Sequence, residues 1–108
     1  MRDYKLYLDD IIESIDKIDR YVKGLDYKSF VSKEILIDAV LRNLEIIGEA
    51  VKNIPSNVRE KYPNIEWNKI AGFRDIVTHA YFGIDEEIVW DIIKNKLFPL
   101  KKEVEKIK

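Results

Sequence analysis

The chain has 108 residues, the length of one modest domain, and we expect residues 1–108 to fold as a single unit. Nineteen basic and twenty acidic residues leave a formal net charge of −1, so the chain lacks the overall basicity typical of proteins that hold nucleic acid through their whole surface. The absence of cysteine excludes disulfides and thiolate metal sites, and no apolar run has the length of a membrane span or the character of a signal peptide. We therefore expect a cytoplasmic protein with no membrane partner, in which any contact with RNA or a nucleotide arises from local chemistry.

Apolar residues at helical spacing predict a first helix over residues 3–23. Gly24 is a natural stop, because glycine adopts the left-handed conformation of a helix C-terminus without steric cost. Residues 25–33 are predicted to form a connector with a helical turn that begins at Asp26 or Ser29.

The second helix, predicted over residues 33–53, has two apolar faces separated by a charged stripe. A helix of this kind lies either at the centre of a bundle or at a surface shared with another subunit. The stripe contains Asp38, Arg42, Glu45 and Glu49. These residues form either a surface ladder of ion pairs, worth a few tenths of a kcal/mol per pair, or a partly buried polar network of Arg42, Glu45 and Glu49. The second apolar face comprises Ile35, Ala39, Ile46 and Ala50.

The remaining elements are also helical. Residues 56–61 are predicted to form a short helix and residues 62–64 a turn, and a further long helix begins near Trp67. The last helix starts at Asp85, which we expect to be its N-cap, and Pro99 should kink or restart it. The sequence thus predicts an all-α fold, an up-and-down bundle of four main helices plus a short one.

Residues 72–83 concentrate the groups that could do chemistry. His79 is the only histidine in the chain, Arg74 precedes it by five residues and Tyr81 follows it by two. Taken singly, each has a common structural role as a helix cap, a surface ion pair or a core aromatic. Together with Asp75 they supply a guanidinium for phosphate charge, an imidazole that exchanges protons near neutral pH and a carboxylate to orient it. This set favours metal-independent RNA cleavage, for which we expect no cofactor.

Helical spacing limits how these residues can act together. Arg74 and Tyr81 share a face, whereas Arg74 and His79 point about 140° apart on a regular helix. Asp75 lies four residues before His79 and could accept a hydrogen bond from it. For Arg74 and His79 to reach one substrate atom, either the helix ends near Thr78 or two copies of the site face each other across a dimer.

Arg74, four residues, His79, Ala80 and Tyr81 match an Arg-x4-His-x-Tyr motif. The sequence resembles the HepT-like toxins of the HEPN superfamily over most of its length. The resemblance lies in this motif and in three segments, LRNLEIIGEA (41–50), WNKIAGFRDIVTHAYFGID (67–85) and EIVWDIIKNKL (87–97). The resemblance implies an all-α endoribonuclease toxin that cleaves RNA or tRNA as a homodimer, with Arg74 and His79 of both copies in one cleft. Asp75 fits the polar position after the arginine, where related members often have asparagine.

The resemblance also implies a partner, a MntA-like nucleotidyltransferase antitoxin that transfers AMP from ATP to Tyr81, as in type VII-like toxin–antitoxin modules. No DNA partner is expected. The competing hypothesis is a non-catalytic helical dimer that binds a nucleotide or a partner nucleotidyltransferase through the same residues. A purely structural bundle ranks last, because it leaves the clustering of Arg74, His79 and Tyr81 unexplained.

Overall fold

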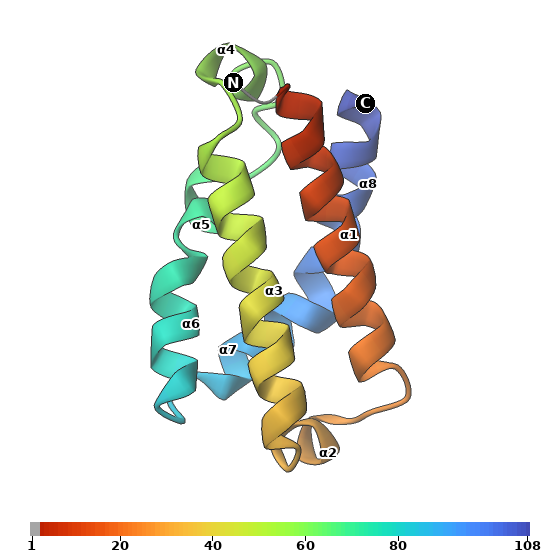
Figure 1. Ribbon diagram of the computed structural model, residues 1–108, viewed down its shortest axis with the longest axis vertical. Helices are drawn as coiled ribbons and strands as arrows, with labels where there is room; N and C mark the ends of the chain where they lie inside the picture. The colour runs from red at the N-terminus through yellow and green to blue at the C-terminus, as the bar shows by residue number, and fades with distance from the viewer. Residues whose placement is uncertain (1–2) are drawn as a thin grey trace.

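A computed structural model describes residues 3–108, and every regular element within them is helical, which confirms the predicted all-α class (Figure 1). None of the described helices is both long and apolar enough to cross a membrane. The elements are α1 (Tyr4–Val22), α2 (Tyr27–Val31), α3 (Glu34–Lys52), α4 (Ser56–Arg59), α5 (Trp67–Ala71), α6 (Phe73–Tyr81), α7 (Glu86–Asp91), the π-helical turn η1 (Ile92–Lys96) and α8 (Leu97–Ile107).

The core of the molecule is the antiparallel pair α1 and α3, which run side by side along its length (Figure 1). Apolar residues recur every three or four positions on each helix, so that one stripe of each is buried against the other. Burying one such side chain contributes roughly 1.5–3 kcal/mol, so this interface supplies much of the stability. Its fully buried members include Leu8, Ile11 and Ile18 of α1 and Val40, Leu41, Leu44 and Ile47 of α3.

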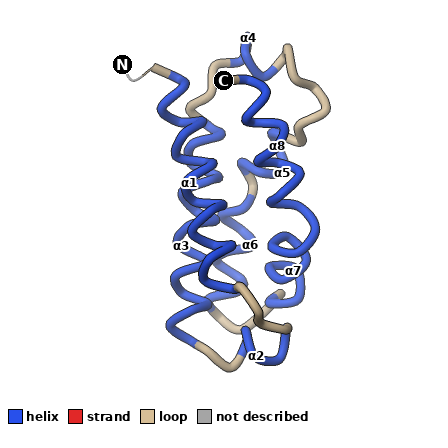
Figure 2. The backbone as a smooth tube through the Cα atoms, turned by 90° about the vertical axis from the view of Figure 1, so that its right-hand side faces the viewer, coloured by secondary structure: helices blue, strands red, loops and turns tan. Residues whose placement is uncertain are grey.

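Local signals set both ends of α1 and the start of α2, and of these signals the stop at Gly24 and the start at Asp26 were predicted. The Asp3 carboxylate accepts a hydrogen bond from the Lys5 amide at 3.0 Å, which caps the start of α1. Gly24, with φ +79°, takes the left-handed conformation that ends the helix. The Asp26 side chain then accepts a hydrogen bond from the Ser29 amide at 2.8 Å and begins α2, which closes one end of the bundle opposite α4 (Figure 2).

The helix predicted from Trp67 is interrupted at Gly72, which separates α5 from α6. Trp67 anchors the start of α5, because its indole N–H lies 3.1 Å from the carbonyl oxygens of both Arg59 and Tyr62. Gly48 of α3 lets this part of the chain come close, since a Cβ there would lie 3.2 Å from the Ile70 carbonyl oxygen.

Helix α3 lies between α1 on one side and α5 and α6 on the other (Figure 1). This central position accounts for its two apolar faces near its C-terminus, where Ala50 is buried. Helices α5 and α6 do not cover the N-terminal end of α3, where the Ile35 side chain is 87% exposed. That end of the second face is therefore available to another subunit.

Pro99 restarts the last helix, as predicted. Proline has no amide hydrogen, so the Asn95 carbonyl cannot form its usual bond four residues on. The chain widens into the turn η1, where the Leu97 amide bonds to the carbonyl of Ile92 five residues earlier, and α8 begins directly afterwards.

Candidate functional site

Helix α6 carries the predicted site residues on its outer surface. Its apolar side chains Phe73, Val77 and Ala80 recur at helical spacing and are buried, at 6%, 3% and 5% exposure. This packing fixes the rotation of α6 and turns its polar face to solvent. The exposed residues of the helix are Arg74, Asp75, Thr78, His79 and Tyr81.

A tight backbone motif ends α6 immediately after Tyr81. Gly83 adopts a left-handed φ of +75°, the Gly83 amide donates to the Ala80 carbonyl at 3.0 Å, and the Ile84 amide donates to the His79 carbonyl at 2.9 Å. This pair of bonds is the Schellman arrangement, which satisfies the last carbonyls of a helix and reverses the chain. The helix therefore continues past Thr78, and the alternative in which it ends there does not hold.

The reversal brings Asp85 back to His79. The His79 Nδ1 lies 2.8 Å from the Asp85 Oδ2, and the two side chains are 57% and 34% exposed. An ionised carboxylate can only accept a hydrogen bond, so Nδ1 carries the proton and donates it. This leaves Nε2 as the ring nitrogen free to exchange a proton with a ligand.

Asp85 itself has an unusual backbone. Its φ is +64°, and it is the one non-glycine residue between 3 and 108 with a positive φ. The residue stands at the N-cap position of α7, as predicted, but its side chain makes no capping hydrogen bond. Its carboxylate accepts the hydrogen bond from His79 instead.

The predicted hydrogen bond from His79 to Asp75 is not formed. Asp75 is exposed one turn before the histidine, and the carboxylate that holds the ring belongs to Asp85. Spacing within the helix could identify only Asp75, because Asp85 approaches through the turn beyond the helix end. The signal that could have found it is Gly83, a glycine just past the last helical residue and two before an acid.

Arg74 and Tyr81 line the same groove, as their spacing on one helix face predicts. The groove lies between α3 and α6, has a volume of about 400 Å³, and does not include His79 among its lining residues. Tyr81 is 51% exposed there. Within residues 3–108 the guanidinium of Arg74 makes no hydrogen bond or ion pair, so its charge is available to an anion.

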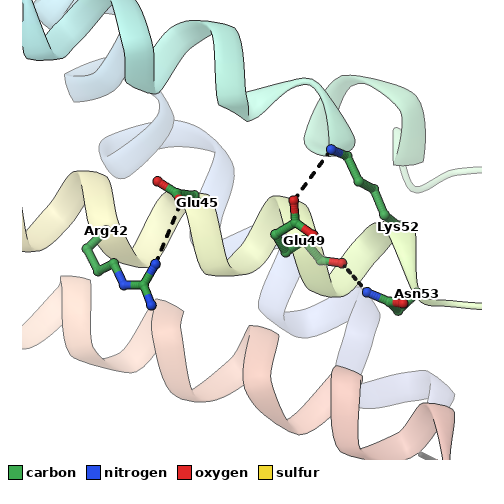
Figure 3. Close-up of polar contacts among 5 residues, drawn as sticks. All are labelled: Arg42, Glu45, Glu49, Lys52 and Asn53. Carbon is green, nitrogen blue, oxygen red and sulfur yellow. Dashed lines mark hydrogen bonds and ion pairs between the residues drawn. The ribbon is translucent and has the colours of Figure 1, made fainter. Parts of the chain in front are cut away.

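The α3 wall of the groove contains Glu45 and Glu49 of the charged stripe, together with Lys52 (Figure 3). Arg42 pairs with Glu45 at 3.6 Å, and Glu49 pairs with Lys52 at 3.6 Å. All four side chains are at least 43% exposed. In the single chain these residues thus form separate exposed ion pairs rather than a partly buried network, and such pairs add little stability.

Two further features define the surroundings of the site. A larger, mostly apolar groove of about 510 Å³ lies between α5, α6, η1 and α8, and none of Arg74, His79 or Tyr81 lines it. Across residues 3–108, no three histidine or carboxylate side chains gather as ligands for a metal ion.

Known proteins resemble this chain along nearly its whole length. A family model described as "Ribonuclease HepT-like" matches residues 11–107. A protein of Methanocaldococcus jannaschii named a "Putative RNase" is 46% identical over 106 residues, 98% of this chain and 88% of that protein. The "Probable ribonuclease HepT" of Thermococcus cleftensis is 39% identical over 107 residues, 99% of this chain and 97% of that protein. No solved structure matches at a significant level.

Proposed function

Because the chain belongs to the HepT-like ribonuclease family, we propose that it is an endoribonuclease that cleaves RNA with Arg74 and His79. The observation that carries this proposal is the state of the single histidine. Its Nδ1 is engaged by Asp85 at 2.8 Å, its ring is 57% exposed, and an unpaired guanidinium lies on the same helix. A group that exchanges protons and a group that binds anions are the minimum that phosphodiester cleavage in RNA requires.

The proposed reaction uses the ribose 2′-hydroxyl as nucleophile. The Nε2 of His79 takes the 2′-hydroxyl proton while the 2′-oxygen bonds to phosphorus and the bond from phosphorus to the 5′-oxygen breaks. A protonated imidazole gives its proton to the departing 5′-oxygen, which leaves a 2′,3′-cyclic phosphate and a 5′-hydroxyl. Arg74 stabilises the negative charge of the pentacoordinate phosphate. These steps are independent of a metal ion.

Two observations support a site that is shared between two copies. Arg74 opens into the groove with Tyr81, whereas His79 lies on another face of α6 beside Asp85. A homodimer that pairs two α6 helices would supply both Arg74 and both His79 side chains to one cleft. The exposed Phe82, at 78%, provides apolar surface at the end of α6 for such a contact.

Tyr81 is the proposed site at which RNA cleavage is inhibited. Its side chain is half exposed in the groove that Arg74 lines, so an anion on its hydroxyl would lie close to the guanidinium. We propose that the chain is the toxin of a toxin–antitoxin pair. Its nucleotidyltransferase antitoxin joins the Tyr81 oxygen to the α-phosphorus of ATP, while the phenolic proton passes to water and pyrophosphate is released. The attached AMP would then compete with the RNA phosphate for Arg74.

RNA cleavage by the purified protein in EDTA tests this proposal, with His79→Ala and the exposed-site control Glu87→Gln made in parallel. His79 is exposed, so its removal should leave the fold intact while it abolishes cleavage. Wild type and Glu87→Gln should cleave equally in the presence of the chelator. Equal RNA binding by wild type and His79→Ala, with cleavage by neither, would instead favour the non-catalytic dimer that grips a nucleotide or a partner transferase.

A further inference from the structure

We infer that Asp85 is a positioning residue, whose carboxylate holds His79 in the Nδ1–H tautomer so that Nε2 is the nitrogen that meets the RNA. This inference rests on the proposed ribonuclease function. It also makes a claim about the free protein that can be tested without RNA.

The hydrogen bond itself determines the tautomer. Nδ1 of His79 lies 2.8 Å from Oδ2 of Asp85, and a carboxylate offers no proton of its own. A neutral imidazole free in water prefers the opposite form, with the proton on Nε2. Asp85 therefore imposes the form in which Nε2 has a lone pair that can accept the 2′-hydroxyl proton.

The backbone holds this contact at the surface, where a pair of mobile side chains would seldom stay together. The Ile84 amide donates to the carbonyl of His79 itself at 2.9 Å, and the Gly83 amide donates to the Ala80 carbonyl at 3.0 Å. The residue next to Asp85 is thus tied directly to the histidine that Asp85 orients.

The conformation of Asp85 also indicates a function beyond folding. A φ of +64° and a ψ of +24° place it in the left-handed region, which glycine adopts without strain. Its side chain gives up the capping role that aspartate usually has at the start of a helix. A strained residue that forgoes its usual stabilising bond and holds the candidate catalytic group instead is the pattern of a functional constraint.

The first test is the tautomer of His79 in the free protein. Because the chain has one histidine, nitrogen-15 correlation spectra of the ring show a single unambiguous pattern. At alkaline pH, where imidazole is neutral, the wild type should show the Nδ1–H form. Asp85→Gly suits the left-handed backbone and should shift the ring toward the Nε2–H form, whereas Asp75→Asn and Glu87→Gln should leave the wild-type pattern.

The Nε2–H form in the wild type, or an unchanged pattern in Asp85→Gly, would overturn the inference. Asp85→Asn is a second variant, because asparagine tolerates the left-handed conformation well. Its amide can donate or accept, so the ring should become a mixture of the two tautomers.

The second test is RNA cleavage by the same proteins. Asp85→Gly and Asp85→Asn should reduce kcat by at least about tenfold, and by no more than the roughly 10²–10⁴-fold that general acid–base catalysis contributes, with little change in KM. Glu87→Gln should cleave like the wild type. Full cleavage by both Asp85 variants would refute the positioning role and leave the ribonuclease proposal standing. A wild type that shows the Nδ1–H form but cleaves no RNA would refute the ribonuclease proposal. The claim that Asp85 fixes the tautomer of His79 would remain valid.

Discussion

Gly24 and Gly83 form a matched pair that separates the stability of the fold from the geometry of the site. Both are left-handed, with φ of +79° and +75°. An added Cβ at Gly24 would meet nothing within 4 Å, and at Gly83 only the Glu86 Oε1 at 3.8 Å. Alanine at either position therefore introduces backbone strain without a steric clash.

The two substitutions should cost similar amounts of stability. The left-handed conformation costs an L-residue about 1–2 kcal/mol, while alanine stabilises by about 0.4–1 kcal/mol through a less flexible unfolded chain. The net loss should be about 1 kcal/mol for each variant. For a domain of this size that corresponds to a fall in Tm of about 4–8 °C, measurable by circular dichroism.

The two variants should differ in activity. Gly83→Ala disturbs the turn that brings Asp85 to within 2.8 Å of His79, whereas Gly24 ends α1 at a distance along the chain from the site. Below both melting temperatures, Gly83→Ala should cleave RNA more slowly and Gly24→Ala should match the wild type. Equal cleavage by both, or a fall in Tm for Gly24→Ala alone, would show that the Gly83 turn does not hold the site.

Three further predictions follow from individual contacts. Tyr81→Phe should cleave RNA normally but resist inactivation by a cognate nucleotidyltransferase with ATP, and loss of its cleavage would count against the role of the phenol. Gly48→Ala gains up to about 1 kcal/mol of helix propensity but crowds the Ile70 carbonyl oxygen at 3.2 Å, an overpacking cost of roughly 1–3 kcal/mol, so urea unfolding should show a net loss. The pKa of Asp26 is lowered from 3.8, first by the hydrogen bond from the Ser29 backbone amide and second by that from the Ser29 side chain. The ionised carboxylate therefore stabilises the fold above that pH, and this stabilisation is lost as acid protonates it. The difference in Tm between wild type and Asp26→Asn should therefore be present at neutral pH and vanish in strong acid, and a constant difference would contradict this.

The parts of the fold that depend on local signals were predictable from the sequence. The periodic apolar residues of α1 and α3, the glycine stop at Gly24, the cap at Asp26 and the break before Pro99 all lie where the sequence placed them. Each depends on interactions within a few residues, which composition and spacing record directly.

The interruption at Gly72 of the helix predicted from Trp67 was not predictable in the same way. The helical pattern continues through Gly72, so spacing alone indicated one long element from Trp67. The separation of α5 from α6 accompanies contacts that are distant in sequence. These are the bonds of the Trp67 indole to the Arg59 and Tyr62 carbonyls and the close approach to Gly48.

The geometry of the candidate site was predictable only in part. Arg74 and Tyr81 share a groove as helical spacing required, whereas the partner of His79 is Asp85 rather than Asp75. The first relation follows from regular helix geometry. The second depends on two left-handed residues beyond the helix end, which no periodic pattern encodes.

Mixing two inactive variants tests most directly whether Arg74 and His79 of two copies form one ribonuclease site. Arg74→Ala retains His79, and His79→Ala retains Arg74, so a mixed dimer contains one of each. After the two proteins are unfolded and refolded together, with mixed dimers verified by native mass spectrometry, RNA cleavage should be partly restored. Mixed dimers as inactive as either variant alone, beside an active wild type refolded in the same way, would contradict the shared site.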